Sequence, residues 1–148
     1  MTKEVLVSIR GAHMVDGDAG DVSVITAGSY YFKNGRHYVI YDELLDDMEG
    51  AIRNTIKIGA GAVDIIKSGA ARSHMNFEKE KTSRSCYVTP YGQMMVGVTT
   101  DGIEISEQPD QLKVSIDYTL EINYEQMSSC HIQIDVSSKS AARLNLSS

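Results

Sequence analysis

The sequence predicts an all-β protein that forms a single antiparallel up-and-down (meander) β-barrel of about eight to ten strands. Three observations predict this fold. Apolar and polar residues alternate with a period of two in successive segments. Turn residues separate these segments at the spacing of β-hairpins. Short antiparallel strands without long helices must hide their edges, as closed barrels do, and the short successive connections favour a meander over a Greek-key sandwich.

The clearest predicted strand begins at Leu112. Apolar residues occupy every second position from there to Tyr124, and polar residues fall between them. A helix would instead need apolar residues at spacings of three and four. The alternation predicts that Ile116 and Leu120 are buried, whereas Asp117 and Glu121 face water.

The same alternation predicts further strands along the chain. Their expected inward-facing residues are Val5, Val7 and Ile9; Val22, Val24, Thr26, Gly28, Tyr30 and Phe32; Ile52, Ile56 and Ile58; Met75 and Phe77; Met94, Val96 and Val98; and Cys130, Ile132, Ile134 and Val136. We expect Gly28 to let its strand bend. Residues 38–43 are expected to form a strand whose inward face the pattern does not decide, and Asp42–Glu49 to form a short helix or a loop with one helical turn.

Turn signals lie between these segments. Asn34-Gly35 is the strongest, because a two-residue type I′ turn needs a positive φ at both central positions. The other predicted turns are Asp16-Gly17-Asp18, Gly59-Ala60-Gly61, Thr89-Pro90-Tyr91-Gly92, Asp101-Gly102 and Pro109-Asp110. Gly59-Ala60-Gly61 lacks the residue order of a phosphate-binding loop, so a hairpin turn is the better interpretation.

Length and composition limit the classes of function. The chain has 148 residues, which predicts one domain over 1–148, with roughly the last ten residues poorly ordered. Acidic residues outnumber basic ones by 20 to 14, which disfavours nucleic acid and anionic membrane surfaces as partners. The sequence shows neither a transmembrane helix nor the apolar core of a signal peptide. Its two cysteines suggest no disulfide framework. We therefore expect a cytoplasmic protein.

Several segments, taken in order, resemble a known family. They are Gly28-Ser29-Tyr30-Tyr31-Phe32-Lys33 with Gly35, His37-Tyr38-Val39-Ile40-Tyr41-Asp42-Glu43, Asn54-Thr55-Ile56-Lys57-Ile58, Lys67-Ser68-Gly69, Met75-Asn76-Phe77-Glu78, Tyr87-Val88-Thr89-Pro90-Tyr91-Gly92 and Leu112-Lys113-Val114-Ser115-Ile116-Asp117-Tyr118. The chain resembles the YwiB-type bacterial family, a domain-of-unknown-function family. The resemblance implies a lipocalin-like (calycin-like) β-barrel in a cytoplasmic bacterial protein, and it implies no established activity.

No catalytic motif is evident in the sequence. The four histidines, His13, His37, His74 and His131, lack the local spacing of a metal pair, so scattered surface histidines are expected. Cys86 has no base beside it, and Cys130 is in phase with buried residues. We interpret the acidic residues Asp42, Glu43, Asp46, Asp47 and Glu49 as a solvated loop, because the pattern of an EF-hand is absent. The basic residues Arg53, Lys57, Lys67, Arg72 and Arg84 are expected on an ordinary mixed-charge face. We expect no enzyme, no metal and no cofactor.

The inward phase suggests a binding function. We hypothesise that one set of residues lines a barrel cavity: Tyr30, Phe32, Asn54, Met75, Phe77, Met94 and Tyr118. Asn54, in phase with Ile52 and Ile56, would be the polar anchor, since a buried amide needs partners. The leading hypothesis is noncatalytic binding of a small hydrophobic or amphipathic molecule in the barrel. The alternative is an interaction module with a filled core, in which an outer face or edge strand docks another protein or forms a homodimer.

Overall fold

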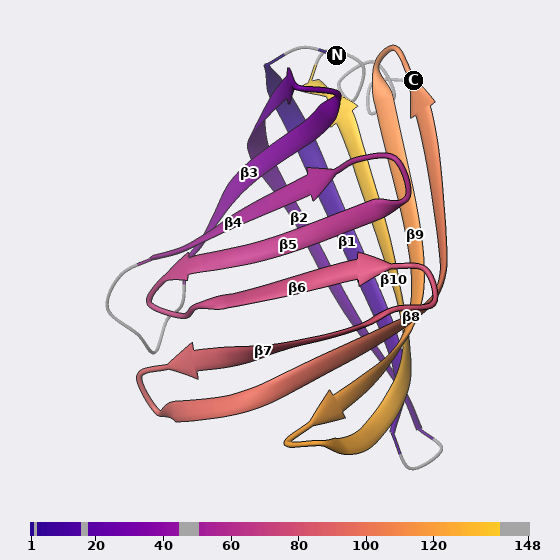
Figure 1. The fold of residues 1–148 in the computed structure, drawn as a ribbon. Coiled ribbons are helices and arrows are strands. Elements are labelled where there is room, and N and C mark those ends of the chain that lie inside the picture. Colours follow the sequence, from indigo (N-terminus) through magenta and orange to yellow (C-terminus); the bar gives the residue numbers. More distant parts are fainter. Residues whose placement is uncertain (2, 16–17, 45–50, 140–148) are drawn as a thin grey trace.

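The computed structural model describes residues 1, 3–15, 18–44 and 51–139, and these form one ten-stranded antiparallel sheet (Figure 1). The strands are β1 (Glu4–Val15), β2 (Asp18–Lys33), β3 (Arg36–Leu44), β4 (Ala51–Ile58), β5 (Ala62–Gly69), β6 (Ser73–Glu78), β7 (Thr82–Thr89), β8 (Gly92–Gln108), β9 (Gln111–Ile122) and β10 (Glu125–Ser138). Among the described residues, no helix is long and apolar enough to cross a membrane.

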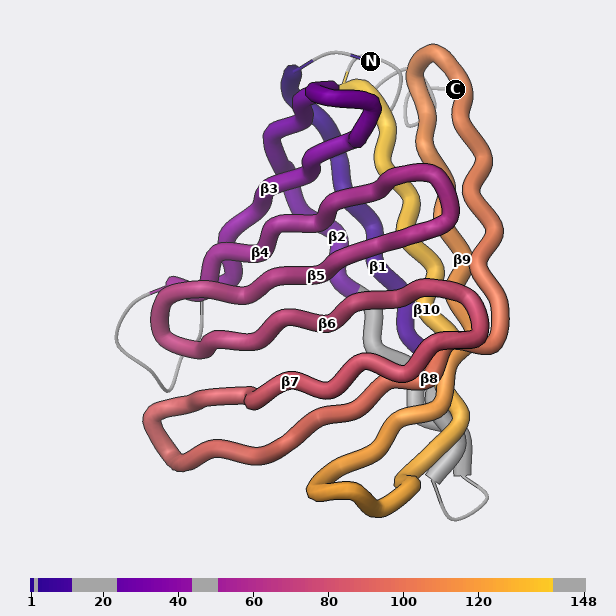
Figure 2. Tube along the Cα trace, viewed as in Figure 1, coloured from indigo at the N-terminus to yellow at the C-terminus, as the bar shows by residue number. Residues whose placement is uncertain are grey.

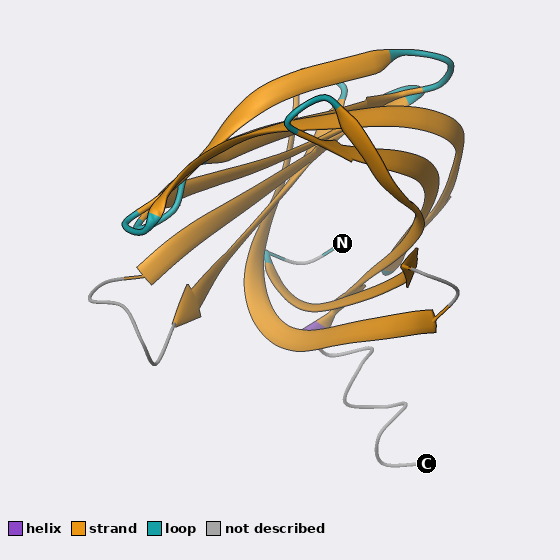
Figure 3. Ribbon diagram, turned by 90° about the horizontal axis from the view of Figure 1, so that it is seen from below, coloured by secondary structure: helices purple, strands orange, loops and turns teal. Residues whose placement is uncertain are grey.

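Neighbouring strands pair along the chain from β1 to β6 and from β7 to β10, and the first strand pairs with the last. The order is β6-β5-β4-β3-β2-β1-β10-β9-β8-β7. Val7 lies opposite Val136 in the β1–β10 pair, and Figure 2 shows the indigo start of the chain beside the yellow end. Seen from below, the strands curve around a common interior (Figure 3). The expected up-and-down barrel is therefore confirmed.

The barrel wall is incomplete at two places. β6 and β7 are the two ends of the sheet, and an isolated bridge between Arg72 and Val88 joins them. β2 pairs with β3 only from Ser29 to Lys33, whereas it pairs with β1 from Asp18 to Ser29. β3 therefore separates from β2 beside Gly28, the glycine at which a bend is expected. We call this second opening the fork.

Alternation places the core inside the barrel as predicted. Val5, Val7, Ile56, Ile58, Ile116, Ile134 and Val136 are all buried and belong to one apolar cluster. In β3 the structure decides the inward face, because Val39 and Tyr41 are buried while Asp42 is exposed. Strands β5 and β7 are not evident from the alternation: β5 has consecutive apolar residues at Ile65 and Ile66, and β7 has serine at Ser83 and Ser85.

Turn chemistry explains most of the connections. Asn34 and Gly35 have φ values of 53° and 75°, as the type I′ prediction requires. The structure also places turns at Gly59-Ala60-Gly61, at Pro90-Tyr91 and at Pro109-Asp110, as expected. The predicted turn at Asp101-Gly102 is wrong: β8 continues through it, and a register shift between Thr100 and Gly102 makes a bulge instead.

Other expectations are corrected in part. The long alternation ends earlier than predicted, because Asn123 and Tyr124 form the β9–β10 turn with positive φ values of 51° and 70°. Ile116 is buried and Asp117 exposed, but Leu120 is only partly buried and Glu121 is half-buried beside Arg84. Asp42 and Glu43 belong to strand β3 rather than to a helix or loop. The remainder of the expected 42–49 element, the Asp16-Gly17 part of a turn, and the C-terminal tail lie outside the described residues.

Candidate functional site

A row of polar side chains crosses the inner face of the barrel. Tyr41 on β3 lies opposite Asn54 on β4, Asn54 lies opposite Lys67 on β5, and Lys67 lies opposite Ser73 on β6. Side chains on one face of a sheet meet at such register positions. We call Tyr41, Asn54, Lys67 and Ser73 the inner polar row. It lies toward the end of the barrel that carries the β5–β6 and β7–β8 turns, here termed the Gly92 end.

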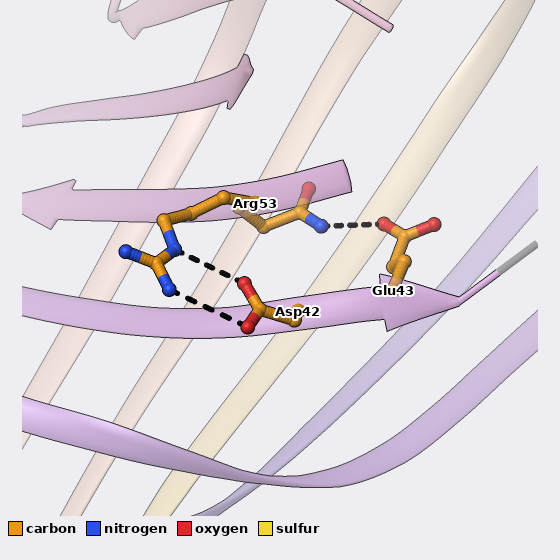
Figure 4. A network of polar contacts seen from close by, with 4 residues as sticks. Asp42, Glu43 and Arg53 are labelled. Atoms are coloured by element: carbon orange, nitrogen blue, oxygen red, sulfur yellow. Dashed lines mark hydrogen bonds and ion pairs between the residues drawn. The ribbon is translucent and has the colours of Figure 1, made fainter. Parts of the chain in front are cut away.

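Hydrogen bonds join this row to Glu43. The Asn54 side-chain amide donates to Glu43 Oε1 at 2.7 Å, and Lys67 Nζ donates to the same oxygen at 2.8 Å and to Asn54 Oδ1 at 2.8 Å. Asn54 is fully buried, whereas the Lys67 and Glu43 side chains keep 23% and 30% exposure. The buried amide is therefore satisfied by charged partners, and the ion pair stays partly exposed to solvent. Figure 4 shows Glu43 in this network beside the exposed Asp42–Arg53 pair.

Tyr41 and Ser73 lie at the two ends of the row, and both are buried. Burial, followed by the charge of Glu43, raises the pKa of Tyr41, so its phenol stays protonated. Ser73 is 8% exposed, and its hydroxyl has no hydrogen-bond partner among the described residues. A buried hydroxyl without a partner costs free energy, and such groups are rare in folded proteins.

A cavity of about 380 Å³ occupies the fork. Its lining includes the buried Val5 and Tyr41 together with the exposed Ala27, Asp42 and Arg53. Because both inward-facing and outward-facing residues line it, the cavity leads from the outside of the wall to core side chains. Tyr41 belongs both to the lining of this cavity and to the inner polar row.

A second cavity, of about 280 Å³, lies at the opposite end and is lined by Tyr30, His37, Glu107 and Leu112 among others. The Tyr30 hydroxyl lies 2.6 Å from His37 Nδ1, and His37 Nε2 lies 2.9 Å from Glu107 Oε1. Burial, followed by the charge of Glu107, raises the pKa of Tyr30. The phenol therefore stays protonated. This chain joins the β2–β3 hairpin to strand β8.

The residues predicted to line one cavity are divided among different places. Phe77 and Tyr118 touch edge-to-face in the core with ring centres 5.0 Å apart. Met75 is partly buried against that core, Asn54 lies in the inner polar row, and Tyr30 lines the second cavity. The inward placement of Phe32 and Met94 is wrong, because their side chains are 61% and 38% exposed. Both lie near strand ends, where the alternation continues past the packed interior.

Several predicted surface residues have specific partners. His37 is only 12% exposed and is held at both ring nitrogens, contrary to the expectation of a surface histidine. His74 and His131 pair on the outside with Asp64 and Asp117, and the side chain of His13 lies outside the described residues. Cys86 is exposed and Cys130 partly buried. Within the described ranges, no three His, Cys, Asp or Glu side chains are arranged to hold a metal ion.

Sequence reasoning missed Glu43 and Lys67 as site residues. Both were assigned to solvated surfaces, but Lys67 follows Val63 and Ile65 at a period of two, and Glu43 follows Val39 and Tyr41 in the same way. Those phases would have placed both side chains on the inner face. Because charged residues are rarely buried, their residue type favours a surface position for Glu43 and Lys67 over the inner face that the alternation indicates.

Comparisons with known proteins agree with this architecture. The crystal structure of YwiB protein from Bacillus subtilis superposes with a TM-score of 0.82, covering 92% of both chains at 20% sequence identity. The Bacillus subtilis (strain 168) protein described as an uncharacterized beta-barrel protein, YwiB, is 25% identical over 129 residues, which are 85% of this chain and 89% of that protein. The model of the domain of unknown function DUF1934 matches residues 7–134. Because that match spans most of the chain and the folds agree, this protein belongs to the DUF1934 family.

Proposed function

We propose that this protein is a noncatalytic binding protein, which takes a small, partly apolar molecule into the half of the barrel between the fork and the inner polar row. The cavity at the fork is the main observation that supports this proposal. Its volume of about 380 Å³ is within the range of small-molecule sites, and it reaches the buried Tyr41 and Val5 from outside.

The chemistry of the lining supports a partly apolar ligand. Val5 and the Tyr41 ring supply apolar surface, and the inner polar row supplies a few fixed hydrogen-bonding groups. Small-molecule sites combine these two kinds of surface, because apolar contact gives affinity and a few polar groups fix orientation.

The experiment is a titration with 1-anilinonaphthalene-8-sulfonate, an amphipathic fluorescent probe. We expect saturable binding to the native protein. Ala27→Phe should weaken it about tenfold or more, because Ala27 lines the fork cavity and a phenyl ring would occupy the space. The matched control is Ala60→Phe, at an exposed alanine in the β4–β5 turn, which should leave affinity unchanged. The absence of saturable binding, or equal effects of both substitutions, would refute the proposal.

A second candidate function is self-association through exposed apolar residues at the Gly92 end. Met94, Tyr124 and Met127 are exposed on two hairpins. Two hydrogen bonds join these hairpins: Asn123 N–H donates to the Met95 carbonyl oxygen, and Met95 N–H donates to Asn123 Oδ1. Clustered exposed apolar residues are typical of interaction surfaces. Native mass spectrometry of the freshly purified protein distinguishes the candidates: a homodimer that Met94→Glu dissociates favours self-association, whereas a monomer with a retained small molecule favours the binding function.

A further inference from the structure

Lys67 and Ser73 lie side by side on the inner face, and each keeps a donor that is not used within the described residues. The Ser73 hydroxyl is buried and has no partner in the described part of the chain. Its register neighbour Lys67 has three ammonium N–H groups, of which two are directed at Glu43 and Asn54. One N–H of Lys67 and the O–H of Ser73 therefore remain, on strands about 4.8 Å apart.

Two neighbouring donors on one face can share a single acceptor atom. A carbonyl or carboxylate oxygen has two lone pairs, and it can accept from both donors when it lies between the two strands. A hydrogen bond from a ligand to the buried Ser73 hydroxyl is favourable, because folding has already removed water from that hydroxyl. An ammonium group has no acceptor lone pair and would face the Lys67 charge.

Glu43 sets the charge of the site. Its carboxylate accepts from Lys67 at 2.8 Å, so the pair is neutral before any ligand binds. A neutral carbonyl therefore fits as well as a carboxylate. Exposure of the pair leaves the ammonium partly solvated, which lets a carboxylate gain some electrostatic attraction.

The next pair along the same two strands is apolar. Ile65 lies opposite Met75, two residues from Lys67 and Ser73 respectively, and both are only partly buried against the core. Polar and apolar pairs thus follow one another on one face, about 7 Å apart along the strands. Met75 is adaptable and suits contact with an alkyl or aromatic group.

We infer that Lys67 and Ser73 bind an acceptor oxygen, carbonyl or carboxylate, of a small amphipathic molecule whose apolar part lies on Ile65 and Met75. This inference rests on the proposed function and adds the chemical class of the ligand and the residues that anchor it. Tyr41, two strands from Lys67 in the same row, also lines the fork cavity.

Isothermal titration calorimetry with three octyl compounds tests the inference. We expect octanoate and octanamide to bind and octylamine to bind at least about tenfold more weakly. Ser73→Ala should weaken octanoate and octanamide about tenfold, the effect of one lost hydrogen bond to a ligand. Ser68→Ala, at an exposed serine on the same hairpin, is the matched control and should change nothing. A preference for octanoate over octanamide would assign the natural ligand to carboxylates, and equal affinities would assign it to carbonyl compounds.

Stability measurements separate an anchoring role from a structural one. Ser73→Ala removes a hydroxyl that has no partner among the described residues, so the midpoint of urea unfolding should stay the same or rise. Lys67→Met also removes a donor, and its control is Lys57→Met at an outward-facing position. Lys67→Met leaves Glu43 without its cation, however, and therefore lowers stability. Ser73→Ala therefore decides the question even where Lys67→Met does not fold.

Two results would overturn the inference. One is binding of octylamine as tight as that of octanoate. The other is a Ser73→Ala variant with lower stability and unchanged affinity. If the fluorescent probe binds and Ala27→Phe weakens it, but Ser73→Ala affects no octyl ligand, the proposed function stands and the anchor falls. If neither the probe nor any octyl compound binds, both fall.

Discussion

Asn54 shows how one residue can be placed by its phase yet have its partners decided elsewhere. Its position between Ile52 and Ile56 puts the side chain on the inner face, where it is fully buried. Its partners, Glu43 and Lys67, come from the two neighbouring strands. A buried amide with two charged partners is specific to one register, because a shift by one residue would separate all three side chains.

Asn54→Leu should therefore lower the free energy of unfolding by about 1–3 kcal/mol, because Glu43 and Lys67 each lose a hydrogen bond inside the barrel. The measurement is urea denaturation followed by circular dichroism. The control is Thr55→Val, the adjacent position on the opposite face, which should stay within about 0.5 kcal/mol. Equal midpoints for Asn54→Leu and the native protein would mean that the amide is not part of the core.

The two phenylalanines provide a second residue-scale prediction. Phe77 is fully buried and packs edge-to-face on Tyr118, so Phe77→Ala should cost about 3–5 kcal/mol. Phe32 is exposed and touches only the ring of His37 among the aromatic contacts of the described residues, so Phe32→Ala should cost less than about 1 kcal/mol. Denaturant midpoints compare the two variants directly. A larger loss at Phe32 would restore the inward placement that the alternation suggested.

At the scale of elements, the hairpin turns and the edges of the strands define the wall. Gly35 and Gly69 both have a positive φ, but their surroundings differ. No atom lies within 4 Å of a Cβ built at Gly35, whereas a Cβ at Gly69 would overlap the Ala51 carbonyl oxygen. Gly69 thus allows the close approach of β4 and β5 at the edge of the inner polar row.

Gly35→Ala should consequently cost about 1–2 kcal/mol, the penalty of a left-handed backbone alone. Gly69→Ala should cost about 3 kcal/mol or more, because the backbone clash adds to that penalty. Thermal unfolding of the two variants under one condition measures the difference. Equal losses would show that the β4–β5 edge can open to accept a side chain.

At the scale of the whole molecule, closing the sheet on itself encloses tyrosines together with aliphatic residues. Burial is the largest cause that raises the pKa values of Tyr41 and Tyr118, and it also raises the pKa of Tyr30. In the unfolded chain these phenols ionise near the ordinary value of about 10. Above that pH the unfolded state binds fewer protons than the folded state, so stability falls as pH rises. Below it both states are protonated, and these groups give no pH dependence.

An alkaline titration tests this coupling. We expect Tyr41 and Tyr118 to ionise only when the barrel unfolds. Tyrosinate absorbance and circular dichroism record the two events. Tyr41→Phe should reduce the loss of stability above pH 10, whereas Tyr124→Phe, at an exposed turn position, should leave it unchanged. Complete tyrosine ionisation before any loss of structure would contradict the burial of these rings.

The local pattern of the sequence determines most of the strands, the meander and much of the core, because side-chain alternation and turn chemistry are properties of neighbouring residues. Residues such as Val5, Ile56 and Ile116 are placed correctly for that reason. Alternation does not indicate where a strand passes beyond the packed interior. For this reason Phe32 and Met94 are exposed although their phase predicts burial. Only the tertiary structure brings Glu43, Asn54 and Lys67 together and separates β3 from β2 at the fork. It also leaves the Ser73 hydroxyl without a hydrogen-bond partner in the described part of the chain. These features depend on the register and curvature of several strands together. The alternation of apolar and polar residues within a single strand encodes neither.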